Sequence, residues 1–132
     1  DMLYTFASNE FEGRRTGEPG QKKAVNFIKD HYVTIGIPSP IADDDYFQEI
    51  PEAFFGGKAK ASENVLAYIK GSEKPDEVLI ISAHLDHEGI KRGEVYNGAE
   101  DDGYCTVASI EIAKDFKSAV DNAVRPNQSI LF

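Results

Sequence analysis

The chain has 132 residues, of which 41% are apolar and 28% charged, the composition of a globular protein with enough chain for one core. The 14 basic and 23 acidic residues give a net charge of −9, which repels phosphate backbones and argues against nucleic acid as a partner. No apolar run approaches the roughly 20 residues that cross a bilayer, and no basic-then-apolar leader is seen, so we expect neither a membrane partner nor a signal peptide. Cys105 is the single cysteine, which excludes an internal disulfide and a cysteine cage for zinc.

The first twenty residues are expected to form a short helix followed by an ordered loop. Apolar side chains on one face predict an amphipathic helix over residues 2–11. Three glycines and a proline in residues 12–20 predict the loop. Within it, the adjacent Arg14 and Arg15 either hold a carboxylate or form a solvated or locally salt-bridged turn.

A longer helix is predicted over residues 21–35, where apolar residues recur at three- and four-residue spacing. Gly36 is placed to end this helix. His31 lies on its apolar stripe, and a lone histidine there is expected to be a hydrogen-bonded core residue and not a ligand.

The rest of the chain predicts strands and a second helix. Alternating patterns predict an edge strand at residues 46–52 and a strand at residues 64–70. Residues 78–83 are apolar on both faces, the pattern of a central strand covered by helices. A helix over residues 103–120 and a buried strand at residues 129–132 complete a right-handed βαβ unit.

Metal-competent side chains follow the strand at residues 78–83, in the sequence His84-Leu85-Asp86-His87. Sites in open α/β sheets gather beyond the carboxyl ends of strands. Neutral His84 is a good zinc ligand, and Asp86 is placed to accept its other ring N–H. From this tetrapeptide alone, a metal site and a metal-free histidine–aspartate hydrogen bond are equally supported.

Adjacent acids at Glu100, Asp101 and Asp102 favour the metal site. Asp102 before Gly103 is fully explained as a helix cap. Three acids are more than a cap needs, and their mutual repulsion falls if one of them binds a cation. A carboxylate can also bridge two metals about 3.5–4 Å apart.

These segments resemble the co-catalytic di-zinc aminopeptidase family, which also holds glutamate carboxypeptidase II and glutaminyl cyclase. The similarity runs from about Leu3 to Phe132, and three segments carry it: residues 12–14, 84–87 and 97–103. The resemblance implies an α/β fold, a phosphorylase/hydrolase-like three-layer α/β/α sandwich with a mixed central sheet, incomplete in this chain. Residues 1–132 would form a single N-terminal portion of a zinc exopeptidase-like domain.

The resemblance also implies roles for five residues. His84 becomes a ligand of one zinc ion, and Asp101 becomes the carboxylate that bridges two. Asp86 becomes the catalytic partner that orients His84, while His87 and Asp102 become neighbours of the site. The general-base glutamate and the remaining ligands are expected beyond Phe132, so this chain would hold about half of the metal site.

Tyr104-Cys105 departs from the small residues usual in the family after the paired aspartates. A tyrosine ring there could crowd the first helical turn against the sheet. Cys105 is either a reactive thiol, because a helix N-terminus lowers the thiol pKa, or a packed and inert residue, which we expect.

The expected function is a zinc-dependent exopeptidase of aminopeptidase type that hydrolyses N-terminal residues of peptides. Two alternatives stay open: a noncatalytic fragment or degenerate module of the same fold, and glutaminyl-cyclase-type acyl transfer. The expected partners are a peptide substrate and a second copy paired through an open sheet edge. By resemblance alone, the protein is expected in the periplasm or outside the cell.

Overall fold

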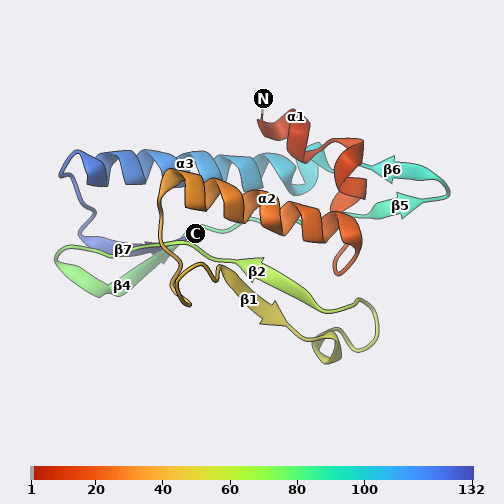
Figure 1. Ribbon diagram of the computed structural model, residues 1–132, viewed down its shortest axis with the longest axis horizontal. Coiled ribbons are helices and arrows are strands. Elements are labelled where there is room, and N and C mark those ends of the chain that lie inside the picture. Colours follow the sequence, from red (N-terminus) through yellow and green to blue (C-terminus); the bar gives the residue numbers. More distant parts are fainter. Residues whose placement is uncertain (1) are drawn as a thin grey trace.

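The structure is a computed structural model that describes residues 2–132. The described residues form a mixed α/β fold in which the strands fall into small separate sheets (Figure 1). The helices are α1 (Met2–Phe6), η1 (Asn9–Arg14), α2 (Pro19–Ile35), η2 (Glu52–Phe55), η3 (Ala99–Gly103) and α3 (Tyr104–Asp121). The strands are β1 (Phe47–Ile50), β2 (Ser62–Val65), β3 (Tyr68–Ile69), β4 (Lys74–Ile80), β5 (Gly89–Lys91), β6 (Glu94–Tyr96) and β7 (Gln128–Leu131).

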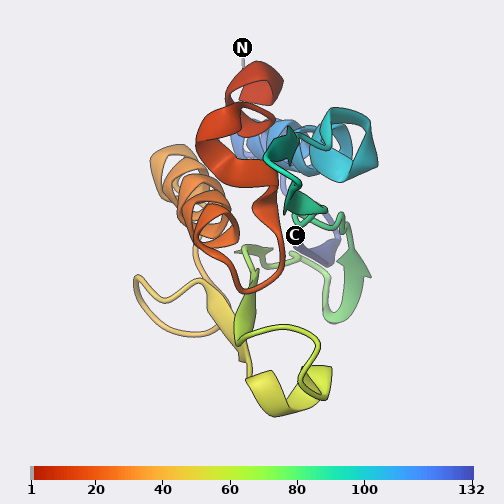
Figure 2. The same ribbon diagram turned by 90° about the vertical axis from the view of Figure 1, so that its right-hand side faces the viewer.

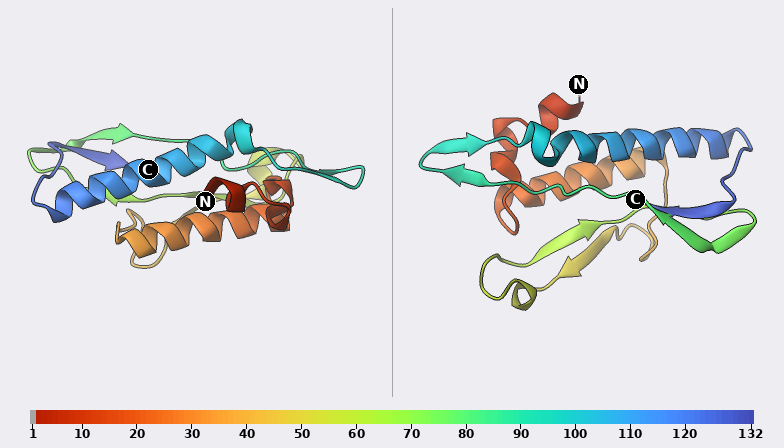
Figure 3. Two further views of the ribbon diagram at one scale, coloured as in Figure 1. Left: turned by 90° about the horizontal axis from the view of Figure 1, so that it is seen from above. Right: turned by 180° about the vertical axis from the view of Figure 1, so that it is seen from behind.

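Helices α2 and α3 lie beside each other on one side of the strands (Figures 1 and 3). The helix predicted at residues 21–35 is confirmed and begins two residues earlier, at Pro19, whose fixed φ suits the first helical turn. Gly36 ends it in the left-handed conformation, with φ of 81°. Figure 3 shows both helices from above, and none of the described helices combines the length and apolar character that a membrane crossing requires.

The core lies between these helices and strands β3 and β7. Its buried residues are Phe6, Phe11, Ala24, Ile28, Tyr32, Ile37, Tyr46, Ala67, Ile69, Ile110, Ala113, Ile130 and Phe132. His31 borders this core as expected, with Nδ1 2.7 Å from the carbonyl oxygen of Phe27. The described part of the chain therefore has one continuous apolar cluster.

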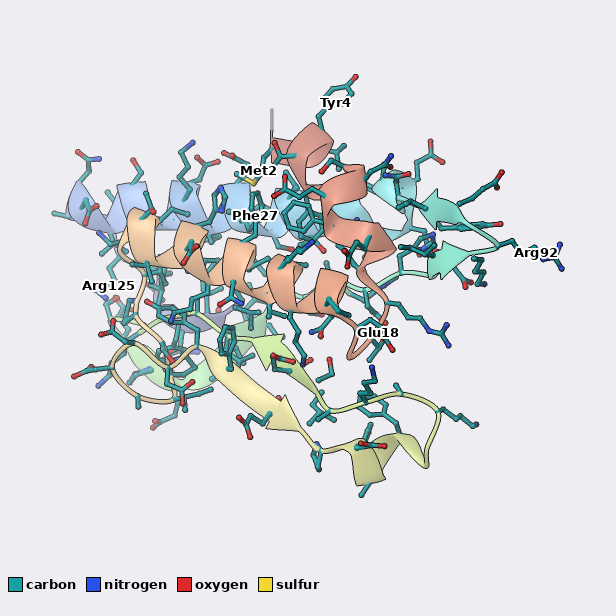
Figure 4. The ribbon with its side chains drawn as sticks, turned by 45° about the vertical axis from the view of Figure 1, so that its right-hand side comes forward. Met2, Tyr4, Glu18, Phe27, Arg92 and Arg125 are labelled. Carbon is teal, nitrogen blue, oxygen red and sulfur yellow. The ribbon has the colours of Figure 1, made fainter. Side chains whose placement is uncertain are left out.

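The predicted N-terminal helix is broken into α1 and η1. The break lies at Ala7 and Ser8, and the backbone kinks again within η1, at Glu12 and Gly13, where φ is 53° and 68°. Rings of Phe6, Phe11 and Phe27 hold the two pieces against α2, with centroid separations of 5.4–5.7 Å. In Figure 4, Phe27 projects from α2 toward this segment, whereas Tyr4 points away from the molecule.

The βαβ unit is confirmed as β4–α3–β7. Strand β4 pairs with β7 in parallel, with Ile80 opposite Leu131, and β3 pairs antiparallel on the other side of β7. The order β3-β7-β4 makes β7 the central strand. A complete three-layer sandwich is not formed by the described residues.

The prediction that residues 78–83 form a covered central strand is wrong. β4 begins four residues earlier than predicted, at Lys74, and ends at Ile80. It lies at the sheet edge, so Val78, Leu79 and Ile80 are 48%, 53% and 63% exposed. Helices cover only one face of this sheet in the described part of the chain (Figure 1), which explains the exposure.

Two further differences concern short strands. The strand predicted at residues 64–70 divides at Leu66, because β2 pairs with β1 whereas β3 pairs with β7. Between His87 and Asn97 the chain forms a hairpin, β5–β6, for which no strand was predicted, with Arg92 at its tip (Figure 4).

This hairpin is anchored at its base by the N-terminal segment. It extends beyond the start of α3, and η1 lies beside it (Figures 2 and 3). A Cβ on Gly13 would lie 2.5 Å from the carbonyl oxygens of both Gly89 and Tyr96. Only a glycine allows η1 to approach both strands so closely.

The buried Tyr32 makes the stability of the fold depend on pH in the alkaline range. Burial raises its pKa to about 12, from an ordinary 10. Between those two values the unfolded chain loses a proton that the folded chain keeps, so the free energy of unfolding falls as pH rises. Tyr32→Phe should remove about 2–3 kcal/mol of that fall, since each pKa unit corresponds to about 1.4 kcal/mol.

Urea unfolding between pH 9 and 12 measures this loss of stability. Tyr4→Phe, at an 82% exposed position, is the control, and equal declines in the Tyr32→Phe and wild-type proteins would contradict the prediction.

Candidate metal centre

Two chain segments that are distant in sequence meet at the end of β4. The chain leaves β4 in an extended conformation that carries His84, and it returns after the hairpin into η3, which carries Asp101. His84 Nε2 lies 3.2 Å from Asp101 Oδ1. The structure thus brings together the two residues that sequence analysis paired as zinc ligands.

Two hydrogen bonds set the orientation of His84, one to its ring and one to its backbone. The ring Nδ1 lies 3.0 Å from the carbonyl oxygen of Asp86. The Thr106 hydroxyl donates to the backbone carbonyl oxygen of His84 over 3.1 Å. A proton on Nδ1 leaves the Nε2 lone pair facing the Asp101 carboxylate. Two acceptors at 3.2 Å repel each other unless a proton or a metal cation lies between them.

Charge around His84 favours a cation. Burial by itself lowers the pKa of His84, but the hydrogen bond to the Asp86 carbonyl raises it, as do the charges of Asp86, Asp102 and Asp101. The net result is a pKa above the ordinary value for histidine. The surrounding carboxylates therefore stabilise positive charge at this position.

Asp101 presents its two oxygens to different histidines. Oδ1 faces His84, and Oδ2 lies 3.5 Å from His87 Nδ1. The side chain of Asp101 is 70% exposed, whereas that of His87 is 16% exposed. A carboxylate whose oxygens point in two directions is able to contact two cations.

Asp86 contacts His84 more closely through its backbone than through its side chain. Its Oδ1 is 3.5 Å from His84 Nδ1, while Oδ2 accepts a hydrogen bond from the Thr16 hydroxyl. Thr16 was not identified from the sequence, because nothing in a glycine-rich loop indicates a contact with a residue seventy positions away.

Asp102 is not a helix cap. Gly103 occupies the cap position of α3 without a side-chain hydrogen bond, and the peptide bond between Asp101 and Asp102 is cis. The hydrogen bond with Asp102 raises the pKa of the Cys105 thiol, although Tyr104 opposes this, so the thiol is not activated. Tyr104 is 53% exposed and does not crowd the sheet.

Arg14 is the residue that sequence analysis misjudged. It is completely buried, so neither a solvated turn nor a carboxylate-binding role describes it. Its guanidinium donates to carbonyl oxygens of Phe6, Leu85, Asn97 and Gly98, over 2.7–3.0 Å. Burial lowers the pKa of Arg14, and the charge of Asp86 partly offsets this.

A cleft of about 420 Å³ opens onto the histidine–aspartate pair, and Arg15, Lys58 and Lys91 also line it. A second cleft, of about 430 Å³, shares Thr16, His84 and Asp86 with the first. A small molecule could therefore reach both His84 and Asp86 from two sides.

The donors at this site fit zinc, but they are incomplete. Zinc bonds of about 2.0–2.2 Å in a tetrahedron separate two ligand atoms by about 3.3–3.5 Å, close to the pair described above. Imidazole nitrogen and carboxylate oxygen are both ordinary zinc ligands. Among residues 2–132, however, no group of three or more histidine, cysteine, aspartate or glutamate side chains is arranged to hold a metal.

His84 follows the carboxyl end of a parallel strand, where ligand sites of open α/β sheets gather, and Asp101 meets it there from η3. The model of peptidase family M28 matches residues 64–132, which include His84, Asp86 and Asp101. The chain belongs to peptidase family M28. Members of this family are metallopeptidases that typically bind zinc. A search of curated protein sequences finds no match to the chain.

Proposed function

We propose that this chain carries the histidine–aspartate half of the zinc centre of an aminopeptidase-type exopeptidase, which hydrolyses the N-terminal residues of peptides. The observation that carries the proposal is the 3.2 Å approach of His84 Nε2 to Asp101 Oδ1. Two metal-competent donors converge there, in the part of the chain that the M28 family model matches.

In this proposal His84 and Asp101 would hold zinc, and the second carboxylate oxygen of Asp101, which faces His87, would remain available to a further cation. When bound there, zinc would supply Lewis-acid chemistry for the hydrolysis of a peptide bond. The Asp86 carbonyl keeps the His84 proton on Nδ1, which leaves Nε2 free as a donor to the metal. His87 limits the rotation of the Asp101 carboxylate by lying beside Oδ2.

Further parts of the proposal concern residues outside this chain. A general-base glutamate and the remaining ligands would follow β7, and the sheet would continue at the free edge of β4 to complete a three-layer α/β/α sandwich. The exposed Val78, Leu79 and Ile80 support this, because an added layer would cover them. Residues 1–132 would then be one portion of a single domain, in a protein of the periplasm or extracellular space.

A zinc titration tests the proposal directly. We expect calorimetry to detect zinc binding to the wild-type chain. In His84→Ala the affinity should fall by more than the roughly 10- to 100-fold that loss of a residue orienting a metal ligand costs. His31→Ala is the matched control, because His31 bonds to a carbonyl oxygen within α2, away from the candidate centre. Zinc binding that is unchanged in His84→Ala would refute the assignment.

A second candidate function is a noncatalytic module that associates with another copy through β4. The exposed apolar edge of β4 favours it, since unpaired strand edges pair readily with other chains. Sedimentation of the zinc-free protein distinguishes the two functions. A dimer that Leu79→Lys dissociates, in a chain without zinc affinity, supports the module, whereas a zinc-binding monomer supports the peptidase.

A further inference from the structure

Arg14 lies at the junction of the two segments that carry the candidate metal ligands. It is fully buried, and it lies outside the range matched by the family model. No carboxylate forms an ion pair with it among the described contacts; its partners are carbonyl oxygens and the ring of Phe6, 4.5 Å from the guanidinium carbon. Burying a cation is costly unless its hydrogen bonds are satisfied, so this arrangement requires a physical explanation.

The first of its contacts fixes the chain at His84. Arg14 Nε donates over 2.7 Å to the carbonyl oxygen of Leu85, the residue directly after His84. In return, the backbone N–H of His87 donates to the Arg14 carbonyl oxygen over 3.2 Å. Arg14 therefore holds the histidine segment through both its side chain and its backbone.

The second set of contacts fixes the chain at Asp101. The two terminal guanidinium nitrogens donate to the carbonyl oxygens of Asn97 and Gly98, each over 2.7 Å. The Gly98 carbonyl also accepts from the backbone N–H of Gly103, over 3.1 Å, which closes the turn that carries Asp101. One planar group thus binds the backbone on both sides of the histidine–aspartate pair.

We propose that Arg14 is a positioning residue that sets the separation between His84 and Asp101, and through it the affinity for zinc. The zinc part of this inference rests on the function proposed above. The guanidinium suits the task because its donors are fixed in one plane and point in several directions, toward the Leu85, Asn97 and Gly98 carbonyls. A lysine has one flexible ammonium group, which cannot reproduce this geometry.

The test compares Arg14→Ala and Arg14→Lys with Ile37→Ala, under conditions where circular dichroism shows each variant to be folded. Ile37 is also completely buried, but it lies just after the far end of α2, so its variant controls for lost stability. We expect Arg14→Ala and Arg14→Lys to bind zinc about 10- to 100-fold more weakly than wild type, the range for residues that orient metal ligands. Ile37→Ala should bind within about twofold of wild type.

Chemical rescue distinguishes a positioning role of Arg14 from a general loss of stability in its variants. Adding propylguanidinium should restore zinc affinity to Arg14→Ala, whereas an equal concentration of urea should not, and His84→Ala should respond to neither. Zinc affinity in folded Arg14→Ala that equals the wild-type value, while His84→Ala loses it, would overturn the positioning role and leave the proposed function intact.

A measurement on the zinc-free protein tests the positioning role of Arg14 separately from the proposed peptidase function. In the zinc-free protein, the nuclear Overhauser contact between the His84 ring and the Asp101 Hβ protons should be present in wild type and Ile37→Ala, and absent in Arg14→Ala. If wild type binds no zinc but this pattern holds, the peptidase assignment fails and Arg14 still sets the separation. If the contact persists in folded Arg14→Ala, the positioning proposal is refuted.

Discussion

Under the proposed aminopeptidase function, Asp101→Asn is expected to reduce the hydrolysis of aminoacyl chromogenic substrates by about a thousandfold or more. The amide keeps the size of the carboxylate but removes the negative charge that faces His84 and His87. A metal centre contributes several kcal/mol to transition-state stabilisation, and about 4 kcal/mol corresponds to a thousandfold change in rate. The measurement is kcat/KM at saturating zinc, together with the zinc content of the purified variant.

The control for this prediction is Glu100→Gln. It removes the same charge at the adjacent exposed residue, so a general change in surface potential would appear in both variants. We expect Glu100→Gln to retain activity within about threefold, because changing an exposed charge alters screened interactions only slightly. Equal losses in the two variants, or normal turnover and metal content in Asp101→Asn, would contradict the role given to Asp101.

Gly20→Ala is expected to lower the free energy of unfolding by about 2–3 kcal/mol, the upper range for overpacking a tight contact. Gly20 lies in the first turn of α2 and is buried. A Cβ at this position would overlap the carbonyl oxygen of Phe11 and come within 2.9 Å of Glu12 Cβ. Since the neighbour is backbone, α2 or η1 must move, and η1 carries Arg14.

Urea unfolding of Gly20→Ala measures this effect, and Asn26→Ala on the exposed face of α2 is the control. Alanine at residue 26 should change stability by no more than about 0.5 kcal/mol, as is usual for surface substitutions. A Gly20→Ala protein as stable as wild type would show that α2 and η1 are not in the close contact described. Zinc affinity measured on the same sample would report whether the movement reaches Arg14.

The sequence pattern predicted the βαβ unit because its signals are local and strong. Apolar spacing marked α2 and α3, and an abrupt change from apolar to polar residues placed His84 at the end of a strand. Topology placed His84 and the acidic residues before α3 at the same edge of the sheet, and the family resemblance selected Asp101 among those acids. Their roles as ligands stay a prediction.

Other features depend on tertiary contacts that no local pattern encodes. The β5–β6 strands are three residues each, too short for a periodic signal. Residues 64–70 read as one strand, yet the chain changes partners near Leu66, which only the positions of β1 and β7 determine. Arg14 carries a charge that favours solvent by composition, and its burial depends on carbonyl groups as distant in sequence as Gly98.

The apolar run at residues 78–83 differs from these cases, because its strand exists but its surroundings are not the expected ones. Its composition indicates burial on both faces, but within residues 2–132 the structure leaves Val78, Leu79 and Ile80 exposed. The apolar pattern shows that this segment is suited to burial on both faces. The described residues supply helices that cover only one of those faces (Figure 1).

The anchored base of the β5–β6 hairpin has a consequence for recognising related sites. Gly13 and Arg14 fix the chain where it enters and leaves the hairpin, while open space surrounds Gly93 near the tip. Insertions at such a tip cost little, because loop-closure entropy rises slowly with length. The number of residues between His87 and Asn97 can therefore vary without displacing His84 or Asp101, and a search pattern for this candidate centre should leave that interval unconstrained.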